Sequence, residues 1–219
     1  MYRHRLLGNV EFPHLPGKVV CVGRNYADHA KELGNEIPTS PLLFMKPATA
    51  MVAMAGPLAL PEGMGACHHE LEMALLIGEP LTKAAPEECR GAIAGIGLAL
   101  DLTLRELQDE LKKKGHPWER AKAFDGACPL AEFVPFDPSM DFKSLTLRLT
   151  RNGGLQQQGS CGDMLFSVEN LLSEISHSFS LLPGDVVLTG TPAGVGPLNS
   201  GDKLLAELGD FLQVETIVA

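Results

Sequence analysis

The sequence has few basic residues for its size: 18 Lys and Arg stand against 27 Asp and Glu, which gives a formal net charge of −9. A nucleic-acid-binding protein needs a basic surface that neutralises phosphates, so this balance argues against such a partner. It does not exclude a small anionic ligand, because a bound cation or a few local Lys and Arg side chains can reverse the field inside a pocket.

Long apolar runs and paired cysteines are also missing. No stretch of about 18 apolar residues is present, so we expect no membrane span, and the first residues lack the apolar core of a signal peptide. The 5 cysteines are odd in number, and no two stand at a C-x-x-C spacing. This pattern fits neither a disulfide framework nor a zinc finger. We therefore expect reduced thiols in a cytoplasmic protein.

Several common enzyme motifs are absent as well. The segment TGTPAGVG (189–196) lacks the G-x-x-x-x-G-K-[ST] pattern of a P-loop and does not open a helix, which excludes a Rossmann loop. No G-x-S-x-G elbow of a serine hydrolase occurs. The hydroxyls and backbone N–H groups of 189–196 can still hold a carboxylate or a phosphate. The alternative for this segment is a tight turn without a ligand.

What remains is an ordinary globular composition, with 219 residues, 45 % hydrophobic and 21 % charged, which is enough for a sizeable core. We expect strands at 18–23, 42–46, 68–78 and 95–101, and hairpins at 145–159 (around Asn152-Gly153) and 204–218. We expect helices at 24–34, 86–93, 103–115 (opened by a Thr103–Glu106 capping box) and 167–179 (capped by Ser167). Because the strands pair locally and do not alternate with long helices, the fold class is α+β.

Three acidic residues stand where their carboxylates can converge. Glu70 and Glu72 are two residues apart on an expected strand and so share one face, and Asp101 ends the apolar strand GIGLALD. Three converging carboxylates form an oxygen-rich site for a hard divalent ion such as Mg²⁺ or Mn²⁺. For Glu70 and Glu72 alone, the alternative is a solvated strand face.

Other polar residues suggest acid–base chemistry beside these acids. His29 and Glu32 are three residues apart on a helix, and a carboxylate that orients a histidine produces a general base. Arg105 and Gln108 share a face of the helix that follows Asp101, so we expect them to face whatever Asp101 binds. Lys122 is a candidate for stabilising negative charge. The alternatives are an exposed helix pair, a polar helix surface and a surface lysine.

Taken in order, five segments resemble motifs of the fumarylacetoacetate hydrolase family: VGRNYADHAKELG, LFMKPATA, HHELEMALLIG, LALDLTLRELQDELKKKGHPWERAKAFD and PGDVVLTGTPAGVGPL. They cover nearly all of the chain and resemble most the small members of the acylpyruvase and oxaloacetate decarboxylase type. The resemblance implies an α+β fold, namely a mostly antiparallel β-roll with peripheral helices. It also implies a short N-terminal extension (1–17), a single catalytic domain (18–219) and a homodimer.

The resemblance further implies the roles of particular residues. The metal-binding acids of the family correspond to Glu70, Glu72 and Asp101, which would hold one Mg²⁺ or Mn²⁺ per chain without an organic cofactor. The water-activating pair corresponds to His29 and Glu32, and the substrate-polarising lysine to Lys122. The substrate-binding positions correspond to Arg24, Asn25, Arg105, Gln108 and Thr191.

The activity that the resemblance favours is metal-dependent hydrolysis of a C–C bond. The substrate would be a small anionic 2-oxo acid, an acylpyruvate such as acetylpyruvate or fumarylpyruvate, and the products pyruvate and a carboxylic acid. The presence of both His29 and Glu32 favours this reading. The alternatives at the same site are oxaloacetate decarboxylation and oxaloacetate keto–enol tautomerisation, then an isomerase or decarboxylase of aromatic catabolism, and finally a non-catalytic metal-binding module. Fumarylacetoacetate itself is not expected, because the enzymes that cleave it carry an extra N-terminal domain.

Overall fold

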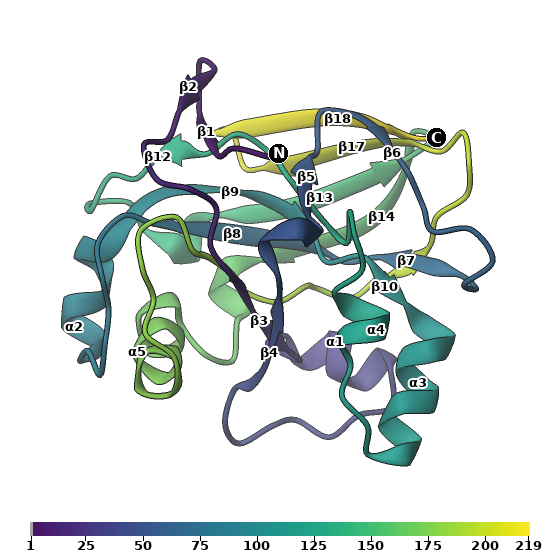
Figure 1. The fold of residues 1–219 in the computed structure, drawn as a ribbon, viewed down its shortest axis with the longest axis horizontal. Coiled ribbons are helices and arrows are strands. Elements are labelled where there is room, and N and C mark those ends of the chain that lie inside the picture. The colour runs from purple at the N-terminus through teal and green to yellow at the C-terminus, as the bar shows by residue number, and fades with distance from the viewer. Residues whose placement is uncertain (1) are drawn as a thin grey trace.

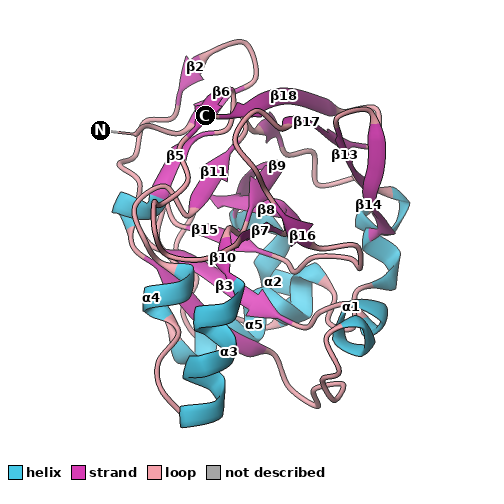
Figure 2. Ribbon diagram, turned by 90° about the vertical axis from the view of Figure 1, so that its right-hand side faces the viewer, coloured by secondary structure: helices cyan, strands magenta, loops and turns pink. Residues whose placement is uncertain are grey.

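β-Sheets dominate the computed structural model, which describes residues 2–219. The largest sheet follows the order β4-β3-β15-β8-β9-β11-β5, with β12 paired to β9 beside this path. Its strands are β3 (Val19–Gly23), β4 (Leu42–Lys46), β5 (Met51–Ala53), β8 (Leu71–Ile77), β9 (Ile93–Leu100), β11 (Cys128–Leu130), β12 (Val134–Pro135) and β15 (Val186–Leu188). Figure 2 shows β8 and β9 near the centre of the molecule, with the other strands curled around them.

A second sheet of five strands follows the order β14-β13-β17-β18-β6. Its strands are β6 (Gly56–Leu58), β13 (Thr146–Arg151), β14 (Gly154–Ser160), β17 (Lys203–Leu208) and β18 (Leu212–Val218). Two small sheets are formed by β7 (Cys67–His69), β10 (Thr103–Leu104) and β16 (Gly196–Pro197), and by β1 (Arg5–Leu6) and β2 (Val10–Glu11). The main hydrophobic core lies between the two large sheets, because it contains buried residues of β8 and β9 together with those of β13 and β17.

The helices lie below the sheets in Figure 1. They are α1 (Ala27–Glu32), α2 (Pro86–Cys89), α3 (Arg105–Lys114), α4 (Glu119–Lys122) and α5 (Val168–Ser178). Short 3₁₀ turns span Ala48–Ala50, Arg90–Ala92, Phe142–Ser144 and Cys161–Asp163. Helices α2 and α5 gather at one side, and α3 and α4 at the other (Figure 1). Within the described residues, no helix has the length and apolar character needed to cross a membrane.

The α+β class is confirmed, but the expectation that strands pair locally in a mostly antiparallel β-roll is partly wrong. Most pairs are antiparallel, whereas β3 pairs β15, β5 pairs β11 and β6 pairs β18 in parallel. Parallel neighbours need a crossover connection, and these pairs join segments that lie far apart in the sequence. Hairpin signals in a sequence indicate only the pairing of consecutive strands, so they do not reveal these three parallel pairs.

The strand pair β8–β9 positions the most interesting polar residues. Every residue of β8 is buried, as expected for a strand covered on both faces. The antiparallel register sets Leu71 opposite Leu100, so Glu70 and Asp101 come next to each other just beyond the paired ends. The backbone N–H of Asp101 donates to the carbonyl oxygen of Glu70 at 2.8 Å. The two acids are therefore fixed by the most deeply buried part of the sheet.

Local signals in the sequence give a mixed result. The Asn152-Gly153 turn is confirmed by the positive φ angles of both residues, and Ser167 caps α5 by accepting from the N–H of Asn170. The Thr103–Glu106 capping box is wrong, because Thr103 lies in β10 and its hydroxyl donates to the carbonyl of Asp101. Helix α3 begins later, with Leu104 as an N-cap that has no side-chain hydrogen bond.

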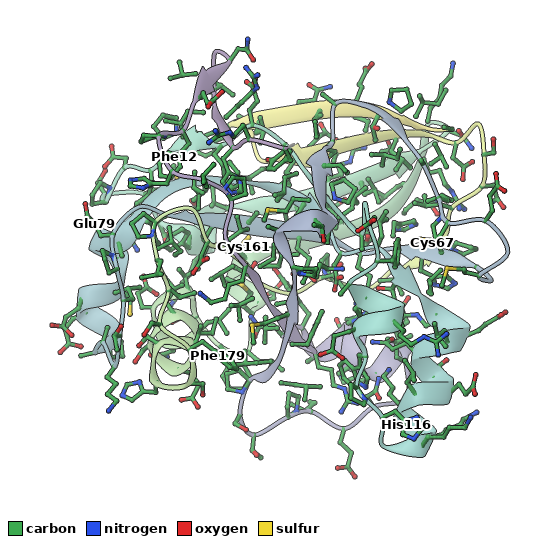
Figure 3. All side chains as sticks on the ribbon, viewed as in Figure 1. Phe12, Cys67, Glu79, His116, Cys161 and Phe179 are labelled. Atoms are coloured by element: carbon green, nitrogen blue, oxygen red, sulfur yellow. The ribbon has the colours of Figure 1, made fainter. Side chains whose placement is uncertain are left out.

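All five cysteines are buried and unpaired, as expected. Cys67 on β7 and Cys161 at the start of a 3₁₀ turn lie in different parts of the molecule (Figure 3). The thiols therefore form no disulfide framework within the described residues.

His4 gives the fold a specific sensitivity to acid. The side chain is fully buried, with Nε2 3.0 Å from the carbonyl oxygen of Gly184. Nδ1 has no partner in the described part of the chain. Burial lowers the pKa of His4 from 6.5 to about 4. The unfolded chain therefore takes up a proton at a higher pH than the folded chain does, and stability falls as the pH drops from about 6.5 towards 4.

We expect the free energy of unfolding to fall by about 2–3 kcal/mol across this pH window because of His4, since one pKa unit corresponds to about 1.4 kcal/mol. Urea unfolding of the unmodified protein and of His4→Gln between about pH 7 and pH 4.5 measures this effect. Glutamine keeps a donor for Gly184 but does not titrate. The variant should lose clearly less stability on acidification, and an equal loss in both proteins would contradict the assignment.

Candidate active site

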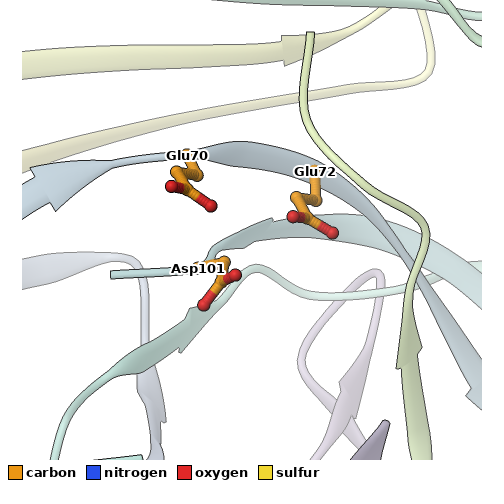
Figure 4. Close-up of side chains that lie close together, drawn as sticks. All are labelled: Glu70, Glu72 and Asp101. Carbon is orange, nitrogen blue, oxygen red and sulfur yellow. The ribbon is translucent and has the colours of Figure 1, made fainter. Parts of the chain in front are cut away.

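Glu70, Glu72 and Asp101 bring their carboxylates together at one point (Figure 4). One oxygen of each lies within 4.8 Å of the others, and all three side chains are buried. Glu70 lies between β7 and β8, Glu72 is the second residue of β8, and Asp101 follows β9. In Figure 4, Asp101 faces the two glutamates from the neighbouring strand. The structure thus assembles the acids whose spacing suggested convergence.

Three cations surround two of these acids. Arg105 and Lys122 both bind Glu70, the latter with Nζ 2.8 Å from Oε2. Lys122 Nζ also lies 2.5 Å from Asp101 Oδ2, and Lys46 Nζ lies 2.7 Å from Asp101 Oδ1 as an ion pair without hydrogen-bond alignment. Burial favours the neutral form of Glu70, but the charges of Lys122 and Arg105 outweigh it and hold the pKa of Glu70 well below its usual range.

Glu72 lies in the opposite electrostatic situation. Within the described residues it has no cationic partner, and its Oε2 accepts only the backbone N–H of Gly190 at 2.6 Å. Burial, and then the neighbouring charges of Asp101 and Glu70, raise the pKa of Glu72 well above its usual value. The cluster therefore contains one buried carboxylate that an additional positive charge would stabilise in its ionised form.

The residues present fit a hard divalent cation. All three candidate ligands are carboxylates, the donor type that Mg²⁺, Mn²⁺ and Ca²⁺ prefer. Burial raises the pKa of the Cys67 and Cys128 thiols and outweighs the opposing charge of Lys46, which disfavours the thiolate form that a soft metal ion would need. The uncompensated charge at Glu72 is the feature that a divalent cation would neutralise.

His29 and Glu32 form the expected pair on α1. His29 Nδ1 lies 3.2 Å from Glu32 Oε2, and His29 is almost completely buried. The other carboxylate oxygen of Glu32 accepts the backbone N–H of Gly194 at 3.0 Å. Glu32 therefore links helix α1 to the loop 189–196 and at the same time orients the imidazole. His29 lines the same pocket as the three acids.

Four of the five expected substrate-binding residues also line this pocket: Arg24, Arg105, Gln108 and Thr191. Arg105 and Gln108 are joined by a hydrogen bond of 2.7 Å between Nη1 and Oε1. The hydroxyl of Thr191 donates to the carbonyl oxygen of Leu71 at 2.8 Å. The loop 189–196 is thereby attached to the strand that carries Glu72.

Asn25 has a different environment from the one expected. Its side-chain amide donates to the carbonyl oxygens of Thr189 and Phe166, and its oxygen accepts the N–H of Phe166. It is fully buried and is not among the residues that line the pocket. The structure thus gives Asn25 the role of joining two backbone segments beside the pocket.

Lys46, at the end of β4, is a residue of this site that the sequence reasoning missed. Its side chain is 0 % exposed. Besides its ion pair with Asp101, Nζ donates to the carbonyl oxygens of Lys122, of Ala127 at 3.0 Å and of Leu102 at 3.4 Å. The signal was a lysine at the end of the apolar strand LLFMK, because a lysine is almost never fully buried unless it is paired. Lys46 joins the backbone around Asp101 to the end of α4.

Gln157 on β14 was missed as well. Its oxygen accepts the backbone N–H of Leu71 at 3.0 Å and lies 3.0 Å from His69 Nδ1. Its nitrogen donates to the hydroxyl of Thr191 and to the carbonyl oxygen of Pro192. No sequence pattern in the hairpin 146–160 predicts that Gln157 contacts Leu71, because β14 and β8 belong to different sheets.

Known proteins resemble the chain over most of its length. The family model described as fumarylacetoacetate (FAA) hydrolase C-terminal matches residues 18–219. The oxaloacetate tautomerase YcgM of Escherichia coli (strain K12) is 50 % identical over 205 residues, which cover 93 % of this chain and 94 % of that protein. The mitochondrial oxaloacetate tautomerase FAHD1 of Homo sapiens is 41 % identical over 188 residues, which cover 86 % and 85 %.

Solved structures give the same picture of similarity. A putative fumarylacetoacetate isomerase/hydrolase from Oleispira antarctica superposes with a TM-score of 0.96 at 52 % identity and covers 100 % of both chains. The fumarylpyruvate hydrolase from Pseudomonas aeruginosa, in complex with Mn²⁺ and pyruvate, superposes with a TM-score of 0.93 at 32 % identity and covers 100 % of this chain and 95 % of that one.

Proposed function

The chain belongs to the fumarylacetoacetate hydrolase family, and we propose from this that it catalyses the keto–enol tautomerisation of oxaloacetate with a divalent metal ion, Mg²⁺ or Mn²⁺. The observation that carries the proposal is the pocket in which three buried carboxylates lie beside an oriented histidine and a buried lysine. Acylpyruvate hydrolysis, which the sequence pattern favours, becomes the second candidate, because both curated relatives are named oxaloacetate tautomerases.

Glu70, Glu72 and Asp101 are the residues that would hold the ion. When bound there, the ion supplies Lewis-acid polarisation of the 2-oxo group, which makes the neighbouring C–H more acidic. Mg²⁺ and Mn²⁺ both accept carboxylate oxygens, and the Pseudomonas aeruginosa relative was solved with Mn²⁺.

His29 moves the proton in this proposal. Tautomerisation transfers one proton between C3 and the oxygen on C2 of oxaloacetate, and no water is consumed. With Nδ1 directed at Glu32, Nε2 is the ring atom left to accept the proton from C3 and to deliver it to the oxygen on C2, and the reverse transfer converts the enol into the ketone.

Lys122, Arg105 and Gln108 bind and stabilise the substrate in this proposal. Burial lowers the pKa of Lys122, but Asp101 and Glu70 outweigh that effect and raise it above its usual value. The ammonium group therefore stays charged and donates to the oxygen on C2 as negative charge develops there. Arg105 and Gln108, already joined to each other, would hold the carboxylate next to the 2-oxo group.

The test is the decay of the enol form of oxaloacetate, followed by its ultraviolet absorbance with Mg²⁺ or Mn²⁺. Free metal ions also promote tautomerisation, so heat-inactivated protein at the same metal concentration is the reference. We expect acceleration that disappears with EDTA and returns when metal is added. If the native protein is no faster than the reference with either ion, the proposed function is wrong.

His29→Gln is expected to lower kcat for tautomerisation by about 10²-fold, the lower end of the range for a general base. The affinity for Mn²⁺, measured by calorimetry, should stay within about twofold because His29 is not one of the candidate ligands. Glu32→Gln keeps the shape of the pair but removes its charge, and should have a smaller effect on kcat. An unchanged kcat in His29→Gln would refute the role of this residue.

Hydrolysis of fumarylpyruvate or another acylpyruvate is the second candidate, because the same His29–Glu32 pair can activate a water molecule. The ratio of kcat/KM for oxaloacetate and fumarylpyruvate in the same preparation separates the two activities. A ratio in favour of oxaloacetate supports tautomerisation as the main activity, whereas a ratio in favour of fumarylpyruvate supports hydrolysis.

A further inference from the structure

Two cations in the pocket have no partner among its three carboxylates. Lys46, Lys122 and Arg105 pair with Glu70 or Asp101. Arg24 and Lys112 line the same pocket. Across residues 2–219 Arg24 forms no ion pair. Among the same residues Lys112 pairs only with Asp109 on its own helix, with Nζ 3.7 Å from Oδ1. The three carboxylates of the pocket therefore neutralise neither of these two positive charges.

Lys112 is held at the pocket wall by the helix and by an aromatic ring. Arg105, Gln108 and Lys112 follow the i, i+3, i+7 spacing of one helix face, and all three line the pocket. Lys112 Nζ lies 5.5 Å from the ring centre of Trp118, a cation–π distance. Its side chain is only 23 % exposed, in contrast to the neighbouring Lys113, which is exposed.

Arg24 reaches the pocket through an unusual backbone conformation. Its φ of 62° is in the left-handed region, which is rare for a large side chain and is often found at functional sites. On one side Gly23 ends β3, and on the other the side chain of Asn25 is hydrogen-bonded to Phe166 and Thr189. The backbone on both sides of Arg24 is thus fixed by the fold.

The positive charges near Lys112 influence the pKa of its ammonium group. Burial first, and then the positive charges of Arg105, Arg24 and Lys122, lower the pKa of Lys112, against the opposing effect of Asp109. Positive charges that lie this near one another repel, and a bound anion relieves the repulsion. This part of the pocket is therefore suited to an anionic group.

Building on the proposed function, we propose that Arg24 and Lys112 bind the substrate carboxylate that is remote from the 2-oxo group. The site would then select 2-oxo dicarboxylates over 2-oxo monocarboxylates of the same length. Oxaloacetate has a second carboxylate at C4, whereas acetylpyruvate has none beyond the one next to its 2-oxo group. A guanidinium and an ammonium group that come from two different segments, Arg24 after β3 and Lys112 on α3, can both donate to such a carboxylate.

The test compares oxaloacetate with 2-oxobutanoate, which has a methyl group in place of the second carboxylate. Exchange of the C3 hydrogens in D₂O, followed by NMR, reports on both substrates by the same proton transfer. We expect Lys112→Met and Arg24→Met each to raise KM for oxaloacetate by about tenfold, as loss of one charge-assisted contact implies. The selectivity for oxaloacetate over 2-oxobutanoate should fall by the same factor, with kcat little changed.

Two further variants control for charge and for the helix. Lys112→Arg keeps the charge and should keep most of the selectivity. Lys113→Met removes an equal charge from the exposed side of the same helix, and should leave the selectivity unchanged. A loss of selectivity in Lys113→Met as large as that in Lys112→Met would overturn the inference, because a general charge effect would then explain it. Equal losses on both substrates would overturn it as well.

An equilibrium measurement separates this inference from the proposed function. Malate and 2-hydroxybutanoate differ by the same carboxylate, and neither undergoes this tautomerisation. Calorimetry in the presence of Mn²⁺ should show that malate binds more tightly and that Lys112→Met removes the difference. If malate binds no more tightly than 2-hydroxybutanoate, the inference fails whatever the catalytic result. If the difference is found but oxaloacetate is not turned over, the proposed function alone fails.

Discussion

Glu72→Gln is expected to abolish the thermal stabilisation of the protein by Mn²⁺ and to leave the metal-free protein at least as stable as the unmodified chain. Retained stability of the metal-free protein is unusual for such a substitution, because removing a buried charge usually breaks an ion pair and destabilises the fold. Glu72 has no cationic partner within the described residues, and Asp101 and Glu70 repel its charge. The neutral amide removes that repulsion and can still accept the N–H of Gly190.

The metal-dependent part of the experiment follows from mass action. An ion that binds only the folded state adds a stabilisation that grows with its concentration above Kd. Loss of one of three carboxylate ligands should weaken Mn²⁺ binding by at least about 10²-fold, a cost comparable to that of losing a charge-assisted contact. Thermal unfolding with and without Mn²⁺, together with calorimetry, measures both effects.

Asp28→Asn is a suitable control, because Asp28 is also acidic but its side chain is 83 % exposed, and among residues 2–219 it pairs only with Lys31 on the surface. This substitution should change neither the Tm nor the response to Mn²⁺. A Glu72→Gln protein that binds Mn²⁺ as tightly as the unmodified chain would show that Glu72 is not a ligand.

Lys46→Met should destabilise the fold by about 3–5 kcal/mol, the cost of removing one partner of a buried ion pair. The methionine fills much of the same space but leaves Asp101 without one of its cations. It also leaves the carbonyl oxygens of Lys122 and Ala127 without their buried donor. A second consequence should be weaker Mn²⁺ binding, by about 10–100-fold, since Lys46 orients a candidate ligand without being one.

Lys31→Met is the matched control for this prediction. The substitution is chemically identical, but the Lys31 side chain is 68 % exposed, and its ion pair with Asp28 lies on the surface. Surface ion pairs contribute about 0–1 kcal/mol. Urea unfolding should therefore show a large shift for Lys46→Met and almost none for Lys31→Met. Similar small shifts in both would mean that the Lys46 network contributes little to stability.

The convergence of the three acids, and the pairing of His29 with Glu32, could be predicted from the sequence. Spacing of two on a strand and of three on a helix determines which side chains share a face, and the structure follows both rules. The resemblance to a known family then joined segments that spacing alone leaves unconnected, such as α1 and the loop 189–196. The contact between Glu32 and Gly194 shows how near these two segments lie.

Other features depend on partners that no local pattern identifies. Nothing in the strand LLFMK indicates that Lys46 meets the carbonyl groups at the end of α4. The capping-box pattern at Thr103 was overridden by pairing of β10 with β7, which drew the hydroxyl group towards Asp101. Asn25 was expected to face substrate and instead joins two backbone segments. In each case the decisive neighbour is distant in sequence and becomes visible only when the strands are assembled.

The place of β15 in the large sheet also has a consequence for how the chain folds. This strand, at Val186–Leu188, lies between β3 and β8 and pairs with both. The first strand of the sheet therefore cannot join the central pair until most of the polypeptide has left the ribosome. Contacts of such long sequence separation slow folding. A nascent chain that ends before β15 would leave the facing edges of β3 and β8 unpaired. The acidic cluster should therefore become shielded from water only after synthesis of the chain has passed β15.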